Sequence, residues 1–243
     1  MKISLLTCAC LLTLLAPAIA LAQSSGADDR PLTPPRSITS ASNQKARPIP
    51  IDDLYYTRSV EDAAWSPDGK EIAFSMDMSG RSNLWKVSAA GGWPIQLVQS
   101  DERQGRAAWS PDGKWIVYQQ DGGGNELWDI FAVPSDGGDI VNLTNSADVA
   151  EVAPRWSPDG RTIALNVKTK TGTQSDLALL DWASRKIRHL THESAPDRSW
   201  RSVAWSADGK TLYANRTEVA ASDGDVFGID VATGKSTNLT PHQ

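Results

Sequence analysis

One short phrase occurs four times along the sequence. The tryptophans that open the copies are roughly 44 to 49 residues apart, which is close to the period of the four-stranded blades of propeller proteins. The repeat therefore predicts a tandem array of similar β-sheets. The copies are Trp65-Ser-Pro-Asp-Gly-Lys70, Trp109-Ser-Pro-Asp-Gly-Lys114, Trp156-Ser-Pro-Asp-Gly-Arg161 and Trp205-Ser-Ala-Asp-Gly-Lys210.

Each copy of the phrase has the residues of a tight turn between two antiparallel strands. In the first copy Pro67 fixes φ at the second position of a type I turn, Asp68 suits the third, and Gly69 supplies the positive φ that follows. Trp65 ends the first strand, and its large ring is expected to be buried between neighbouring blades. The same roles are predicted for Trp109, Asp112, Gly113, Trp156, Asp159, Gly160, Trp205, Asp208 and Gly209.

Three further apolar strands follow the first one in each repeat. In the second repeat they are expected at 115–118, 127–133 and 140–144. We predict an all-β fold, a β-propeller made of four WD-like four-stranded blades at about 60–100, 104–145, 150–192 and 200–240. Four such blades form an open arc more naturally than a ring, so the ring is predicted to be incomplete. The best candidate for a helix is 51–58.

The first 22 residues have the pattern of a secretory signal peptide. Lys2 precedes the apolar run Leu5–Leu15, and Ala20-Leu21-Ala22 is a small-x-small cleavage sequence. Cleavage after about Ala22 predicts a periplasmic or secreted protein. Residues 23–50 are rich in Pro, Ser and other polar residues, so they are predicted to be a disordered linker that leads into the propeller at 51–243.

Composition excludes several classes of function. Both cysteines, Cys8 and Cys10, lie in the signal peptide, so the mature chain has no disulfide framework, thiol nucleophile or cysteine metal site. The formal net charge is −5 and no basic run is present, which argues against a nucleic-acid partner. After signal cleavage no segment is apolar enough to enter a membrane.

No metal or cofactor is predicted. His189 and His192 are three residues apart, but they fall on an expected outer strand and loop, and the pattern His-Glu-x-x-His is absent. The run 122–124 is three glycines, and a hairpin loop accounts for it better than a phosphate loop, which would need a following helix and Lys. Loop Asp and Asn residues leave calcium as an alternative, although the twelve-residue calcium loop is absent and turn chemistry explains them.

The repeats resemble the propeller domain of exported serine peptidases of the prolyl oligopeptidase family, in the dipeptidyl aminopeptidase and acylaminoacyl peptidase branch. The resemblance covers about 51–243. The short phrase alone is shared with the propeller of the Tol translocation protein, which binds partners and catalyses nothing. Besides that phrase, the resemblance rests on Asn83-Leu-Trp85, Ala89-Ala-Gly-Gly92, Asn125-Glu-Leu-Trp-Asp-Ile130, Val231-Ala-Thr-Gly-Lys235 and Asn238-Leu-Thr-Pro241.

The resemblance implies a role without catalysis on this chain. In that family the propeller precedes an α/β-hydrolase domain, gates access to it and helps to bind the peptide. No Gly-x-Ser-x-Gly nucleophile elbow occurs here, so no catalytic residue is predicted. The implied function is a substrate-gating, peptide-binding portion that is inactive as a hydrolase by itself, with a C-terminal hydrolase domain missing from this chain. The alternative is a stand-alone periplasmic protein-binding propeller of the Tol-like type.

Three arginines are candidates for a peptide-binding role. Arg106, Arg155 and Arg201 each precede the Trp of their repeat by one to four residues, on strands that line the central channel of a propeller. Their guanidinium groups suit an anionic group such as a peptide carboxylate. The alternative is that these arginines are solvated or paired residues at strand ends, with no role in binding. Because side chains alternate between the two faces of a strand, the three arginines are not expected to share one face. Asp62 aligns with Arg106 and is expected to pair with it across adjacent blades.

Overall fold

The structure of the chain is a computed structural model, which describes residues 59–241 apart from 79 and 218–223. The chain divides into two compact units, Met1–Ile51 and Asp52–Gln243, and every described residue belongs to the second. The predicted signal peptide at 1–22, the linker at 23–50 and the candidate helix at 51–58 lie outside the described residues.

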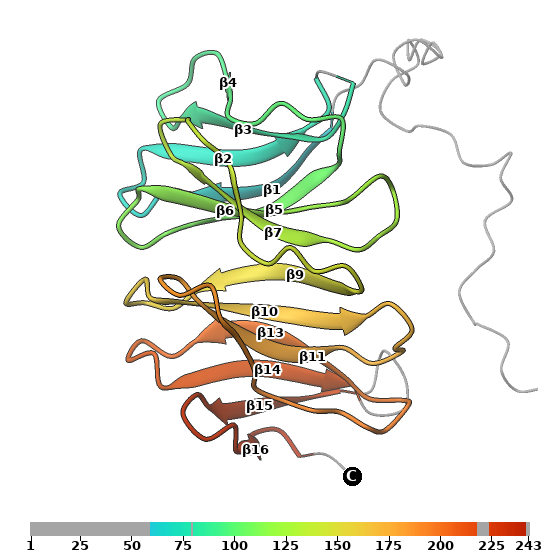
Figure 1. The fold of residues 1–243 in the computed structure, drawn as a ribbon. Helices are drawn as coiled ribbons and strands as arrows, with labels where there is room; N and C mark the ends of the chain where they lie inside the picture. The colour runs from blue at the N-terminus through green and yellow to red at the C-terminus, as the bar shows by residue number, and fades with distance from the viewer. Residues whose placement is uncertain (1–58, 79, 218–223, 242–243) are drawn as a thin grey trace, which may run out of the picture. The chain divides into compact units, whose positions relative to one another are not determined.

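Sixteen strands form four antiparallel four-stranded sheets, each made of four consecutive strands. The sheets stack face to face in chain order (Figure 1). The described residues contain no helix. The predicted fold class, four blades of an incomplete propeller, is therefore confirmed. The strands are β1 Val60–Trp65, β2 Glu71–Met76, β3 Asn83–Ser88, β4 Ile95–Gln96, β5 Gln104–Trp109, β6 Trp115–Gln120, β7 Asp129–Pro134, β8 Val141–Asn142, β9 Val149–Trp156, β10 Thr162–Thr169, β11 Asp176–Asp181, β12 Ile187–His189, β13 Ser199–Trp205, β14 Thr211–Thr217, β15 Gly224–Asp230 and β16 Ser236–Asn238.

The repeated phrase forms the hairpin between the first two strands of every blade. In blade 1 the amide of Gly69 donates to Ser66 O at 2.9 Å, and Gly69 has a φ of 69°. Ser66 Oγ donates to Asp68 Oδ1 at 2.7 Å and accepts from the amide of Glu71 at 2.9 Å. The side-chain bond from the serine holds the pKa of the hairpin aspartate below its usual value in all four copies, at Asp68, Asp112, Asp159 and Asp208.

Successive blades meet at seams that repeat the same contacts. Each seam is filled by an apolar cluster; between blades 2 and 3, for example, Ile130 and Leu143 pack with Leu165 and Leu180. The Trp of the phrase also crosses the seam, because its indole N–H donates to the carbonyl just before the Trp of the preceding blade. These bonds are Trp109 Nε1 to Ala64 O at 3.1 Å, Trp156 Nε1 to Ala108 O at 3.3 Å, and Trp205 Nε1 to Arg155 O at 3.0 Å.

The two end blades leave part of a seam uncovered. Trp65 is 62% exposed, whereas Trp109 is 9% exposed in the equivalent place, and Trp156 and Trp205 are partly buried. The prediction that the Trp of the phrase is buried between blades therefore holds fully for Trp109, in part for Trp156 and Trp205, and is wrong for Trp65. No described blade precedes blade 1 to cover that ring. At the other end Leu239 of blade 4 is 50% exposed, whereas its counterpart Leu143 is 4% exposed. Each end blade therefore exposes residues that pack against a neighbouring blade at the internal seams.

The outer strands are tied inward by aspartates at the start of the third strands. In blade 2 Asn142 Nδ2 donates to Asp129 Oδ2 at 2.7 Å, and Thr144 Oγ1 donates to Asp129 Oδ1 at 3.2 Å. Asn238 and Thr240 bind Asp225 in the same way in blade 4. The sequence Asn-Leu-Thr, which occurs at 142–144 and again at 238–240, thus stabilises the outer rim of blades 2 and 4.

Candidate functional site

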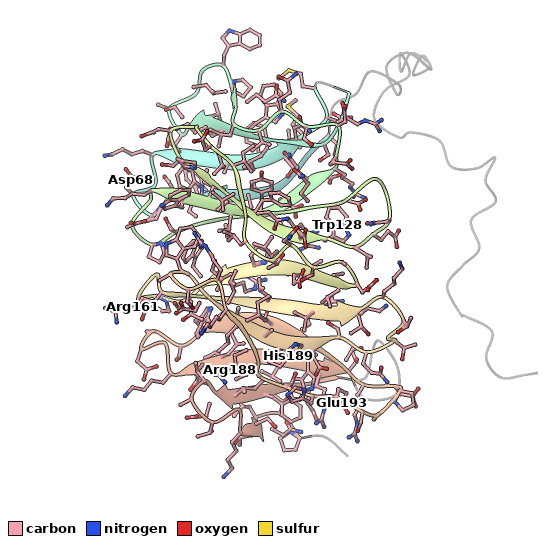
Figure 2. All side chains as sticks on the ribbon, in the orientation of Figure 1. Asp68, Trp128, Arg161, Arg188, His189 and Glu193 are labelled. Carbon is pink, nitrogen blue, oxygen red and sulfur yellow. The ribbon has the colours of Figure 1, made fainter. Side chains whose placement is uncertain are left out.

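The first strands of the four blades surround a hollow of about 500 Å³. Since these strands are the innermost of each blade in a propeller, the hollow lies where the central channel of a complete ring would run. Figure 2 shows Asp68 and Arg161, from the hairpin turns of blades 1 and 3, on the same side of the stack, and Trp128 toward the opposite side. The hollow is lined by Asp62, Ala63, Arg106, Ala107, Ala108, Trp109, Pro111, Ala153, Pro154, Arg155, Trp156, Val203, Ala204 and Trp205.

The predicted pair of Asp62 and Arg106 is present at the rim of this hollow. Arg106 Nε lies 3.7 Å from Asp62 Oδ1, and the amide of Arg106 donates to Asp62 Oδ2 at 3.1 Å. Both residues have a positive φ, 54° and 56°, and so does Ala153 at the same place in blade 3. Such left-handed residues other than glycine are uncommon and cluster at binding sites. Each coincides with a register shift in its blade.

Arg155 lines the same hollow without an acidic partner. It is exposed, and its guanidinium has no hydrogen bond or ion pair with any residue in the described part of the chain. Desolvation of the guanidinium by the walls of the hollow, and after it the positive charge of Arg106, lower the pKa of Arg155. The backbone at this position is fixed, because Arg155 O accepts the indole N–H of Trp205. The hollow therefore holds two cations and one carboxylate.

The third predicted arginine is placed differently. Arg201 is exposed on β13, paired with Asn215 of β14, and it does not line the hollow. The structure thus brings Arg106 and Arg155 together and leaves Arg201 apart, as strand alternation predicts for at least one of the three.

A second hollow of about 420 Å³ adjoins the first and was not foreseen from the sequence. It shares Asp62 and Arg106 with the first hollow and adds Arg103 and Trp128. The guanidinium carbon of Arg103 lies 5.6 Å from the ring centroid of Trp128, within the range of a cation–π contact. Trp128 belongs to the loop before β7, and nothing in its local sequence indicates that it approaches the first strand.

His189 and His192 are the histidines to be weighed as metal ligands from the sequence. His189 and His192 stack with ring centroids 5.5 Å apart. Over the described ranges no group of three or more His, Cys, Asp or Glu side chains is arranged to hold a metal ion. Within the same ranges no helix has the length and apolar character needed to cross a membrane.

Comparison with known proteins identifies solved propellers with a similar fold. No family model matches the chain, and no curated protein matches it. A putative TolB from Agrobacterium tumefaciens matches with a TM-score of 0.61 at 23% identity over 74% of this chain, and TolB from Acinetobacter baumannii with 0.59 at 21% over 76%. A structure from a study of two prolyl endopeptidases matches with 0.59 at 17% identity over 77% of this chain.

These similarities establish the fold and no more, because the identities are low. The chain spans 64% of the Agrobacterium protein, 44% of the Acinetobacter TolB and 29% of the prolyl endopeptidase. Its structural neighbours thus include both TolB-like propellers and the propeller parts of peptidases.

Proposed function

We propose that this chain is the non-catalytic propeller portion of an exported serine peptidase of the prolyl oligopeptidase family. It binds and gates peptide substrates for a C-terminal hydrolase domain and does not hydrolyse them by itself. The observation that carries the proposal is the pair of uncovered end faces. Trp65 and Leu239 are 62% and 50% exposed, whereas Trp109 and Leu143 in equivalent places are 9% and 4% exposed. Further blades of a larger ring would cover these two faces.

The central hollow supports the peptide-binding part of the proposal. Its volume of about 500 Å³ falls in the range of sites that bind small ligands or short peptide segments, about 300 to 1,000 Å³. Three tryptophans and two arginines line it, and aromatic residues and arginines are enriched where proteins recognise partners. A substrate on its way to a hydrolase domain would meet these side chains.

A stand-alone periplasmic protein-binding propeller of the Tol-like type is the second candidate. The fold of the Agrobacterium TolB, of which this chain spans 64%, supports it. In that case the end faces would be covered by a protein partner, and no hydrolase would be involved.

The transcript beyond codon 243 separates the two candidates. The peptidase proposal expects an in-frame α/β-hydrolase domain with a Gly-x-Ser-x-Gly elbow, and it expects the extended protein, but not the present chain, to react with a fluorophosphonate probe. A stop codon directly after codon 243, together with a monodisperse purified protein, would refute the peptidase proposal and favour the Tol-like alternative. Fluorophosphonate labelling of the present chain would refute both.

A further inference from the structure

We propose that Arg155, together with Arg106, binds the carboxylate of a peptide in the central hollow. This inference rests on the proposed function, since it names the chemical group by which a peptide is recognised there. The carboxylate is either the C-terminal group of the peptide or an Asp or Glu side chain, and the two share the same chemistry.

The charges in the hollow are unbalanced in favour of an anion. Arg106 has Asp62 as a partner at 3.7 Å, whereas no described acid pairs with Arg155. Two like charges on one concave surface repel each other, and this repulsion is relieved when an anion binds between them. A guanidinium offers a planar fork of N–H donors that matches the two oxygens of a carboxylate.

The surroundings of the two arginines suit a peptide. The lining between them consists mostly of small apolar residues, such as Ala107 and Ala153, beside the rings of Trp156 and Trp205. Small side chains leave room for a peptide backbone, and the rings offer apolar contact to its side chains. Arg106 and Ala153 lie at register shifts within strands that are paired in their sheets, and a site carried on paired strands is expected to need little rearrangement on binding.

The test compares three peptides by isothermal titration calorimetry on the full chain. The probes are Ac-Ala-Ala-Phe-OH, its C-terminal amide, and Ac-Ala-Glu-Phe-NH₂. We expect the plain amide to bind about ten- to a hundredfold more weakly than the better of the two carboxylate peptides, as for loss of a charged hydrogen-bonded group. The tighter of those two identifies the source of the carboxylate. Binding should weaken as salt is raised, because part of the attraction is between exposed charges.

Variants locate the effect. Arg155→Gln should weaken the carboxylate peptide about tenfold or more, and Arg155→Lys, which keeps the charge but loses the fork, should give a smaller loss. Arg201→Gln is the matched control, since it removes the same charge from a position on β13 that does not line the hollow, and it should leave binding unchanged. The bond from Trp205 to the backbone of residue 155 is kept in every variant, so the variants are expected to fold.

The outcomes separate this inference from the proposed function. Equal binding of all three peptides would overturn carboxylate recognition and leave peptide binding in place. Equal losses of peptide affinity in Arg155→Gln and Arg201→Gln would overturn the assignment of carboxylate binding to Arg155. Absence of binding by any probe at about 1 mM would also overturn the inference. Whether the chain is part of a peptidase is decided separately, by the transcript beyond codon 243.

Discussion

Glu151 provides a quantitative prediction about the seam between blades 2 and 3. This residue of β9 is 2% exposed. Its Oε1 accepts from Ser146 Oγ at 2.6 Å, and its Oε2 is buried without a hydrogen-bond partner among the described residues. Burial raises the pKa of Glu151 to about 7 from 4.5, and the nearby charge of Asp129 adds to the increase. The folded protein therefore holds this proton more tightly than the unfolded chain.

The sign and size of the effect follow from that difference in pKa. The contribution of neutral Glu151 is fully present below pH 4.5 and is lost as the pH rises to about 7. A difference of about 2.5 between the two pKa values corresponds to about 3 kcal/mol in the free energy of unfolding. Glu151→Gln is neutral at every pH and keeps the shape of the protonated acid. It should therefore be more stable than the wild type by up to about 3 kcal/mol at pH 8 relative to pH 4.5.

Urea denaturation at a series of pH values measures this difference directly. Any fixed cost of the amide cancels, because only the change between pH 4.5 and pH 8 is compared. Glu126→Gln, at an exposed loop position, removes the same charge without burial and should follow the wild-type curve. If Glu151→Gln and the wild type lost stability in parallel between these pH values, the burial of an ionisable carboxyl in this seam would be refuted.

Three further predictions test the seams and the hairpins. Trp109→Ala should lower the free energy of unfolding by about 3–5 kcal/mol, as measured by urea denaturation. Trp65→Ala, at the same place in the phrase but 62% exposed, should lower it by about 0.5 kcal/mol or less. Similar losses in the two variants would contradict an uncovered first blade. Gly160→Ala should cost about 1–2 kcal/mol, since Gly160 has a φ of 69°, and an unchanged unfolding midpoint would argue against that turn. Asn142→Ala removes the bond to Asp129 and should cost about 1–3 kcal/mol in thermal unfolding, an expectation that a neutral or stabilising result would reject.

The blades could be predicted from the sequence because their signals are local. Pro67, Asp68 and Gly69 specify a turn through their own backbone preferences, and the structure has that turn with Gly69 at a φ of 69°. The third strand of blade 2 was expected from residue 127, but β7 begins at Asp129. Glu126 has a φ of 60°, so the chain is still turning just before that strand.

The hollow could be predicted only in part, because its composition depends on where the bulges fall. Each first strand has a register shift, and in blade 4 it lies between Ser202 and Ala204. A shift of one residue moves a side chain to the other face of a strand. Arg155 follows the register shift of its strand and Arg201 precedes the shift of its own, so their places relative to the hollow depend on the backbone path as well as on sequence spacing. The approach of Trp128 to Arg103 depends on contacts between separate segments and has no local signal.

The stack of blades is open at its first face, since Trp65 is exposed there and no described blade covers it. Exchange of the indole N–H protons with solvent deuterium, followed by NMR of ¹⁵N-tryptophan in the full chain, tests it most directly. Trp109, Trp156 and Trp205 donate across seams, so their signals should be protected, whereas that of Trp65, whose ring is 62% exposed, should exchange quickly. Equal protection of all four would contradict an open first face, because the first blade would then be covered like the others.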